Sequence, residues 1–228
     1  MKTIFSKKSA VVLTMICMIA IVISSCKKNN NDVIVEGNAN LRVVNSVQGS
    51  NPQDFYQRDT KLTTSAVAYG ESSNFLTAQA GASTISFRNS GSTTANVTAN
   101  VGIKTNASYT VFYYSNAAGG AQINGYEEDN TAPASGKSKV RFINVGSALT
   151  NSINVVAAGG ASLTTGLTFG YGSVYTTIDA NTALNVTVLG SATSTAISGA
   201  TFASGKIYTI WFDAASTTTA NYHVIVQN

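Results

Sequence analysis

The side chains that most often carry out catalysis are sparse in this chain. Its one histidine, His223, lies in an alternating run near the C-terminus. A Ser-His-Asp triad would need His223 as its base and a serine on a Gly-x-Ser-x-Gly turn. The nearest segments, 81–85 (Gly-Ala-Ser-Thr-Ile) and 160–164 (Gly-Ala-Ser-Leu-Thr), both lack the final glycine. We therefore expect no serine-hydrolase site.

Metal and cofactor signals are equally weak. A zinc site needs three or four ligands, and one histidine with no free cysteine cannot supply the usual set. The segment Gly170-Tyr171-Gly172 lacks the third glycine and the helix of a phosphate-binding loop. We expect no cofactor and no catalytic metal.

Carboxylates offer two further possibilities. The one acidic cluster, Glu127-Glu128-Asp129-Asn130, could hold calcium in a loop, although its spacing is not that of an EF-hand. The alternative is a solvated linker. A carboxylate-dependent hydrolase is also conceivable, but ten scattered acids give no reason to select two of them. The candidates for that chemistry are Asp54, Glu71, Asp179 and Asp213.

Cys26 is the residue with the most specific chemical signal. It follows a basic start, an apolar run of 14 residues from Ala10 to Ile23, and the small Ser24 and Ser25. Such a run is shorter than the ~20 residues of a spanning helix and is typical of an export signal. The segment resembles the lipobox of bacterial lipoproteins, which implies that Cys26 is acylated after residues 1–25 are removed. The alternative is an ordinary cleaved signal with a chance cysteine.

The charge balance changes once that signal is removed. The whole chain carries a net charge of +4, but three of its lysines lie before residue 26. The remainder has eleven basic and ten acidic side chains. A nucleic-acid binder needs a basic face, so we expect no nucleic-acid partner. No thiol besides Cys26 remains for a disulfide or a nucleophile.

After a polar tether over residues 26–38, the chain repeats itself. Three segments recur in the same order at offsets of 99, 100 and 99 residues. The matching segments are 40–45 with 139–144, 68–75 with 168–175, and 108–113 with 207–212. We therefore predict two tandem repeats, over residues 39–132 and 133–228.

Both repeats have the pattern of β structure. Short runs of alternating apolar and polar residues are separated by Gly, Asn and Ser clusters, and no helical period is sustained. The fold class predicted is all-β, with two immunoglobulin- or transthyretin-like antiparallel sandwiches. The predicted strands lack the charged residues that usually prevent pairing between edges. Nothing in these edges therefore prevents a strand of one repeat from pairing with the other repeat or with a partner.

Equivalent tyrosines, Tyr109 and Tyr208, begin a late strand in each repeat. We expect each to form a tyrosine corner by bonding back to the backbone. If both face the core, then Phe112, Tyr114 and Trp211 lie on the opposite face of their strands. These three aromatics would form a surface for a partner, the interface between the repeats, or a face partly covered by loops.

The paired repeats resemble a bacterial family known as domain of unknown function 4397. The resemblance rests on the opening segments 41–45 and 140–144, the Asp54-Phe55-Tyr56 strand, the aromatic-Gly turns at 69–70 and 169–170, and Tyr109-Thr110-Val111. The second repeat departs from it at 154–156 (Asn-Val-Val). The family implies exported, often lipid-anchored β-sandwich proteins and carries no activity to transfer.

These observations favour a non-catalytic envelope protein that is anchored by palmitate or a similar acyl chain on Cys26. Lys27 follows the cysteine where an Asp would signal inner-membrane retention, so we expect the outer membrane, facing the periplasm or the outside. The expected partner is a glycan or an envelope protein, bound by stacking on the aromatics. A purely structural spacer is the alternative, and the carboxylate hydrolase is the third possibility.

Overall fold

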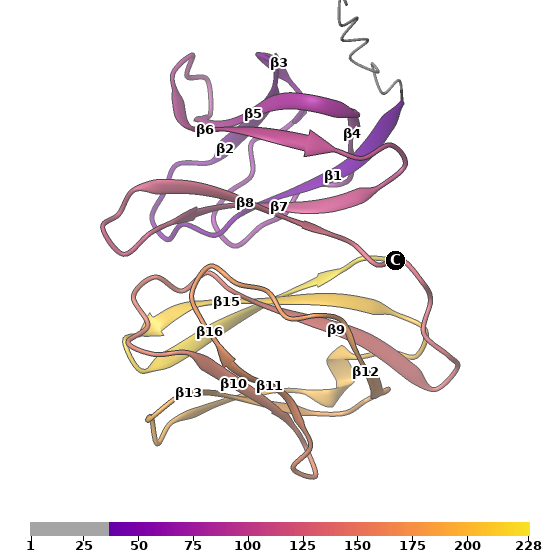
Figure 1. Ribbon diagram of the computed structural model, residues 1–228. Helices are drawn as coiled ribbons and strands as arrows, with labels where there is room; N and C mark the ends of the chain where they lie inside the picture. The colour runs from indigo at the N-terminus through magenta and orange to yellow at the C-terminus, as the bar shows by residue number, and fades with distance from the viewer. Residues whose placement is uncertain (1–36) are drawn as a thin grey trace, which may run out of the picture. The chain divides into compact units, whose positions relative to one another are not determined.

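The computed structural model describes residues 37–228. The first repeat contains β1 (Asn38–Asn45), β2 (Gln53–Gln57), β3 (Thr60–Lys61), β4 (Leu76–Gln79), β5 (Gly81–Asn89), β6 (Ala95–Ile103), β7 (Ser108–Ser115) and β8 (Ala121–Glu127) (Figure 1). The second contains β9 (Lys137–Asn144), β10 (Ile153–Ala157), β11 (Ser162–Leu167), β12 (Thr176–Asp179), β13 (Leu184–Val188), β14 (Ser194–Ile197), the 3-10 turn η1 (Gly199–Thr201), β15 (Ile207–Ser216) and β16 (Thr219–Val226). Across this part of the chain, no helix is long and apolar enough to cross a membrane. The predicted all-β class is confirmed.

Each repeat is built from two four-stranded sheets. We call the sheets β4-β1-β7-β8 and β12-β9-β15-β16 the first sheets, and β3-β2-β5-β6 and β11-β10-β13-β14 the second sheets. The strand order in one repeat reproduces the order in the other. The prediction of two tandem β-sandwiches is therefore confirmed.

The pairing is mostly antiparallel, with one parallel exception in each repeat. β1 pairs in parallel with β7, and Leu41 lies beside Tyr109. β9 pairs in parallel with β15, and Val140 lies beside Tyr208. These parallel pairs depart from the purely antiparallel sandwich expected from the sequence. Their registers match across the repeats, so the duplication extends to the backbone pairing.

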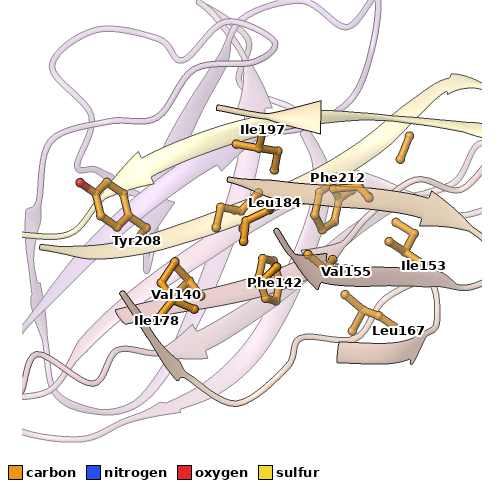
Figure 2. Packing of buried hydrophobic residues seen from close by; sticks show 14 of the residues in the cluster. Val140, Phe142, Ile153, Val155, Leu167, Ile178, Leu184, Ile197, Tyr208 and Phe212 are labelled. Atoms are coloured by element: carbon orange, nitrogen blue, oxygen red, sulfur yellow. The ribbon is translucent and has the colours of Figure 1, made fainter. Parts of the chain in front are cut away.

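Alternating side chains fill the interior of each sandwich. In the second repeat, Phe142 of β9 stacks on Phe212 of β15 with ring centroids 6.2 Å apart (Figure 2). In the first repeat, Phe87 of β5 lies between Phe55 and Tyr113, at 5.1 and 5.3 Å. Burying a large apolar side chain stabilises a fold by ~1.5–3 kcal/mol. The contact of Phe87 with Tyr113 therefore joins the two sheets of the first sandwich, whereas Phe142 and Phe212 lie on one sheet of the second and pack in a core that both sheets line.

The two equivalent tyrosines form the predicted corners. The backbone N–H of Ala203 donates to the Tyr208 hydroxyl at 2.8 Å. In the first repeat, the N–H of Lys104 donates to the Tyr109 hydroxyl at 3.3 Å. Both donors lie five residues before the tyrosine. The hydroxyl thus ties the loop before β7 or β15 to the strand that follows it.

Replacing Tyr208 with Phe should lower the free energy of unfolding by ~1–2 kcal/mol, because the Ala203 N–H would lose its acceptor. Chemical denaturation monitored by Trp211 fluorescence measures the change. Tyr222→Phe is the matched control, since no hydrogen bond joins its hydroxyl to the described residues. Equal stability of Tyr208→Phe and the wild type would contradict a role for the corner.

Candidate functional site

The aromatics predicted as a partner surface lie between the two repeats. Phe112 of β7 and Trp211 of β15 are fully buried, with ring centroids 6.0 Å apart and planes at 75°. Val44 and Ile143 are buried in the same cluster, and Tyr114 is packed against it. The alternation was therefore correct, but the outer face of the first sheet is covered by the other repeat. Of the three alternatives, the structure therefore has the interface between the repeats and not an exposed surface for a partner. Phe112 and Trp211 are not accessible there, and Tyr114 is half-buried.

Two equivalent arginines hold the same interface together. Arg141 of β9 donates from Nη1 to the carbonyl of Glu127 at the end of β8, at 2.9 Å. Arg42 of β1 donates from Nη1 to the carbonyl of Val226 at the end of β16, also at 2.9 Å. Each arginine and each carbonyl is 99 residues from its counterpart. The repeats therefore contact one another as in an isologous dimer, where the same patch serves both partners.

The acidic cluster takes part in this contact. Glu128 is buried and forms an ion pair with Arg141, and it accepts a hydrogen bond from Tyr175 of the second repeat. Its counterpart in the second repeat is the neutral Gln227, which accepts from Arg42 at 2.9 Å. A buried carboxylate that lost its arginine would be strongly destabilising. Glu128 is thus structural and does not belong to a fully solvated linker.

The acids on either side of Glu128 are also paired. Glu127 contacts Lys104 at 2.6 Å, and Asp129 contacts Lys139 at 2.9 Å. The hydrogen bond from Lys139, with others from Thr131, lowers the pKa of Asp129 to about 2. Each acid of the cluster has a protein cation in place of a metal. Within residues 37–228, no group of three or more His, Cys, Asp or Glu side chains is arranged to hold a metal ion.

His223 stacks on Trp211 with ring centroids 3.7 Å apart and planes at 4°. Its Nε2 lies 3.3 Å from Oδ2 of Asp213, which also accepts a hydrogen bond from Tyr69 of the first repeat. Burial raises the pKa of Asp213, but the bonds from His223 and Tyr69 outweigh it and lower the pKa overall. The hydroxyl in this group is bonded to the carboxylate and not to the histidine, unlike the nucleophile of a triad.

The other acids considered for hydrolysis lie apart from this group. Asp54 of β2 is buried and paired with Lys61 at 2.7 Å. Asp179 of β12 is exposed and paired with Lys137 at 2.5 Å. Glu71 is exposed in the segment between β3 and β4. The four candidate acids therefore come from separate elements, and three of them are paired with a cation or with His223.

Truncating Trp211 to Ala should lower the free energy of unfolding by ~3–5 kcal/mol, because it leaves a cavity between the repeats. Thermal and denaturant unfolding measure this loss. Tyr171→Ala is a matched control, since the Tyr171 side chain is 68% exposed and its removal should change stability by no more than ~0.5 kcal/mol. A Trp211→Ala protein as stable as the control would rule out the interface role.

A different polar face lies on the second sheet of the first repeat. Six residues line a hollow of ≈ 240 Å³ on this sheet: Arg58, Asp59, Thr84, Ser86, Arg88 and Thr98. Arg88 of β5 forms an ion pair with Asp59 and lies over the ring of Tyr56, 4.1 Å from its centroid. Arg58 donates to the carbonyl of Ala82 at 2.6 Å and to Gln79 at 3.2 Å. We call Tyr56 and the six lining residues the charged face.

The backbone that presents this face is unusual. Arg58 and Asp59 form the two-residue turn between β2 and β3, and both have positive φ, at 48° and 63°. Asn-Gly or Gly-Gly is usual in such a turn, because side chains are disfavoured in the left-handed region. The second repeat has Gly159 and Gly160 at positive φ in its corresponding turn. Strained residues of this kind concentrate at functional sites.

The charged face has no counterpart in the second repeat. The corresponding positions are related by 99 or 100 residues, and at each of them the charge or ring is absent. The pairs are Tyr56 with Val156, Arg58 with Ala158, Asp59 with Gly159, and Arg88 with Thr187. Both repeats have the same strands there, so the fold does not require these side chains. No motif in the sequence singles out Arg58, Asp59 or Arg88, but comparing charges position by position between the repeats would have found them.

Comparisons with known proteins give a match to one family model and several matches to solved structures. The family model described as Domain of unknown function (DUF4397) matches residues 39–155, just over half of the 228 residues. No curated protein matches. Nine chains of solved structures match. One of them, a streptococcal chain described as "Alpha-glucan binding by a streptococcal virulence factor", is 10% identical. The match covers 82% of this chain and 96% of that chain at a TM-score of 0.24, too low to bear on what this chain binds.

Proposed function

Because the chain belongs to the DUF4397 family, whose function is unknown, any assignment depends on its own residues, and we propose that it is a lipid-anchored, non-catalytic glycan-binding protein. The observation that carries this proposal is the charged face, which the first repeat has and the second lacks. Duplicated units that keep one fold need the same core, but they need not keep the same surface. A cluster of charged groups on one copy alone therefore points to binding.

The side chains of the charged face suit a ligand rich in hydroxyl groups. Arg58 and Arg88 provide only donors, Asp59 provides only acceptors, and the hydroxyls of Thr84 and Thr98 provide both. The Asp59 side chain is 88% exposed, so it can accept further bonds from solvent or a ligand. The Nε of Arg88 is buried without a hydrogen-bond partner among residues 37–228. Hydrogen bonds from a ligand to these charged groups would be stronger than bonds between neutral groups.

These groups are also held in place before any ligand arrives. Arg88 is fixed by Asp59 and Tyr56, and Arg58 by Gln79 and Ala82. Preorganised groups lose less conformational entropy on binding. The hollow is open and lies on the face of a sheet, as a site for part of an extended chain would be. Two arginines and one aspartate leave one excess positive charge, so a sugar acid should bind more tightly than a neutral sugar.

The pairing of the acids supports a role without catalysis. Glycoside hydrolysis needs two carboxyl groups facing one bond, one of them protonated. On the charged face, the only lining carboxylate is Asp59, which is exposed and paired with Arg88. The predicted acylation of Cys26 and the export signal lie outside the described residues. In this proposal they hold the chain at the cell envelope, and Lys27 after the cysteine favours the outer membrane.

Two variants test the charged face. Asp59→Gly and Arg88→Lys should each weaken polysaccharide binding at least tenfold, because the first removes the acceptor and the second removes the planar fork of donors. Asp59→Gly should not lower stability, since glycine relieves the left-handed strain at that position. Affinity gel electrophoresis and calorimetry with soluble neutral and uronic-acid polysaccharides measure binding.

Thr187→Ala, at the position equivalent to Arg88, is the matched control and should bind as the wild type does. Tighter binding of the uronic-acid polymer is expected from the excess positive charge, and equal binding of the two polymers would contradict that charge preference. Binding that is unchanged in both variants, or absent with every polysaccharide, would overturn the proposal in favour of a protein partner.

The anchor has its own test. Cys26→Ser should abolish labelling of the chain by a palmitate analogue and move it out of the membrane fraction, because the substitution removes the thiol that carries the proposed acyl anchor. Protease treatment of intact cells, with a periplasmic protein as control, then shows which side the wild type faces. Unchanged labelling and fractionation of Cys26→Ser would refute the lipobox assignment.

A further inference from the structure

The strand β6 is an open sheet edge of unusual length. It is the last strand of the β3-β2-β5-β6 sheet and pairs with β5 alone. It runs for nine residues, from Ala95 to Ile103, without a charged residue or a proline. Proteins usually protect a sheet edge by shortening it or by adding charge, proline or a bulge. In β6 the register shift lies at its start, opposite Arg88, so the strand is regular from Val97 onward.

Other edge strands of the described chain are shorter or already in use. β3, β4, β12 and β14 have four residues or fewer, and the pairing of β11 with β10 is irregular. β8 and β16 accept hydrogen bonds on their backbone from Arg141 and Arg42, and Thr195 donates to the carbonyl of Ala220 in β16. Within residues 37–228, β6 is therefore the longest edge strand, and no side chain forms a hydrogen bond with its backbone.

The two repeats differ at this edge in what lies beside it. A hollow of ≈ 370 Å³ opens between β6 and β8, and Ala99, Val101, Tyr109 and Ile123 contribute to its lining. In the second repeat the chain leaves the short β14 through η1 to Phe202, which is fully buried and packs on Tyr208 at 5.3 Å. The first repeat has Ile103 at the position equivalent to Phe202. The apolar interior of the first repeat is thus partly open to solvent along β6.

We propose that β6 pairs antiparallel with β6 of a second copy of this chain, which joins the two second sheets into one continuous sheet. The strand is self-complementary about Asn100. In that register Val97 faces Ile103 and Ala99 faces Val101, so apolar side chains meet apolar ones. On the other face Thr98 lies opposite Gly102, which offers no side chain to clash with it. No like charges confront one another, and the two Asn100 amides can bond across the axis.

A second copy fits this edge better than an unrelated strand does. The same edge serves both partners, so the contact closes as a dimer and leaves no further edge to extend. A twofold axis perpendicular to the sheet keeps equivalent faces on the same side. The exposed Thr98 belongs to the charged face, so two such faces would lie on one side of the joined sheet. That last consequence rests on the proposed function; the pairing itself does not.

Single cysteines along the edge test the pairing in the full chain, expressed with its leader in a bacterial host. Paired residues on antiparallel strands have Cα atoms ~4.5–5.5 Å apart, within the range that a disulfide spans. Cys17 and Cys26 are the only natural cysteines. Mild oxidation should therefore link Asn100→Cys into a dimer on a non-reducing gel. Ala196→Cys, on the short edge strand β14, is the matched control and should stay monomeric, as should the chain with no added cysteine.

A second substitution tests the β6 pairing without relying on the Asn100→Cys variant alone. Val101→Lys in the Asn100→Cys background places a charge on the apolar side of the edge and should reduce the dimer at least tenfold, while Asp59→Gly should leave it unchanged. Absence of a dimer in Asn100→Cys, or a link to a different protein, would overturn the pairing. Polysaccharide binding by a chain that does not crosslink would overturn the pairing alone and leave the proposed function standing.

Discussion

The burial of Phe112 and Trp211 between the two first sheets determines what the rest of the molecule can present. Each of these sheets has one apolar face toward its own sandwich and a second aromatic face toward the other repeat. A sheet that is apolar on both sides must be covered on both sides. The second sheets are then the ones whose outer faces stay in contact with solvent. Because the aromatics bury the outer faces of the first sheets, the outer faces of the second sheets are the surfaces available for binding.

The arginines at this interface explain why it has one geometry. Arg42 and Arg141 each reach the last carbonyl of a strand in the opposite repeat, and this fixes the two first sheets in register. Arg141 meets a buried carboxylate, whereas Arg42 meets a neutral amide. The contact is therefore symmetric in shape and asymmetric in charge. The two repeats have diverged even where they still contact each other through equivalent residues.

Much of the fold could be predicted from the period of the sequence, because a strand alternates its faces whatever surrounds it. The alternation placed Phe112, Tyr114 and Trp211 on the face opposite to Tyr109 and Tyr208, as the structure has them. It could not say what covers the second face, because an interface and a free binding surface have the same pattern. The parallel pairing of β1 with β7 and the pairing of Glu128 with Arg141 depend on contacts between distant segments. The charged face was missed because its members lie on β2, β5, β6 and a turn, with no motif in sequence.

The twofold character of the interface also bears on how this chain came to have one specialised repeat. The same patch on each repeat contacts the other, as it would if two separate copies of one unit associated. Joining the copies through the segment 128–136 makes their meeting intramolecular, so it no longer depends on the concentration of the protein. Within one chain the two copies also have separate sequences, so a residue can change in one copy and not in the other. In a separate dimer, the left-handed aspartate at position 59 would appear twice, with its strain in both subunits. In the fused chain it appears once, and the other repeat has Gly159 at that position, without the strain.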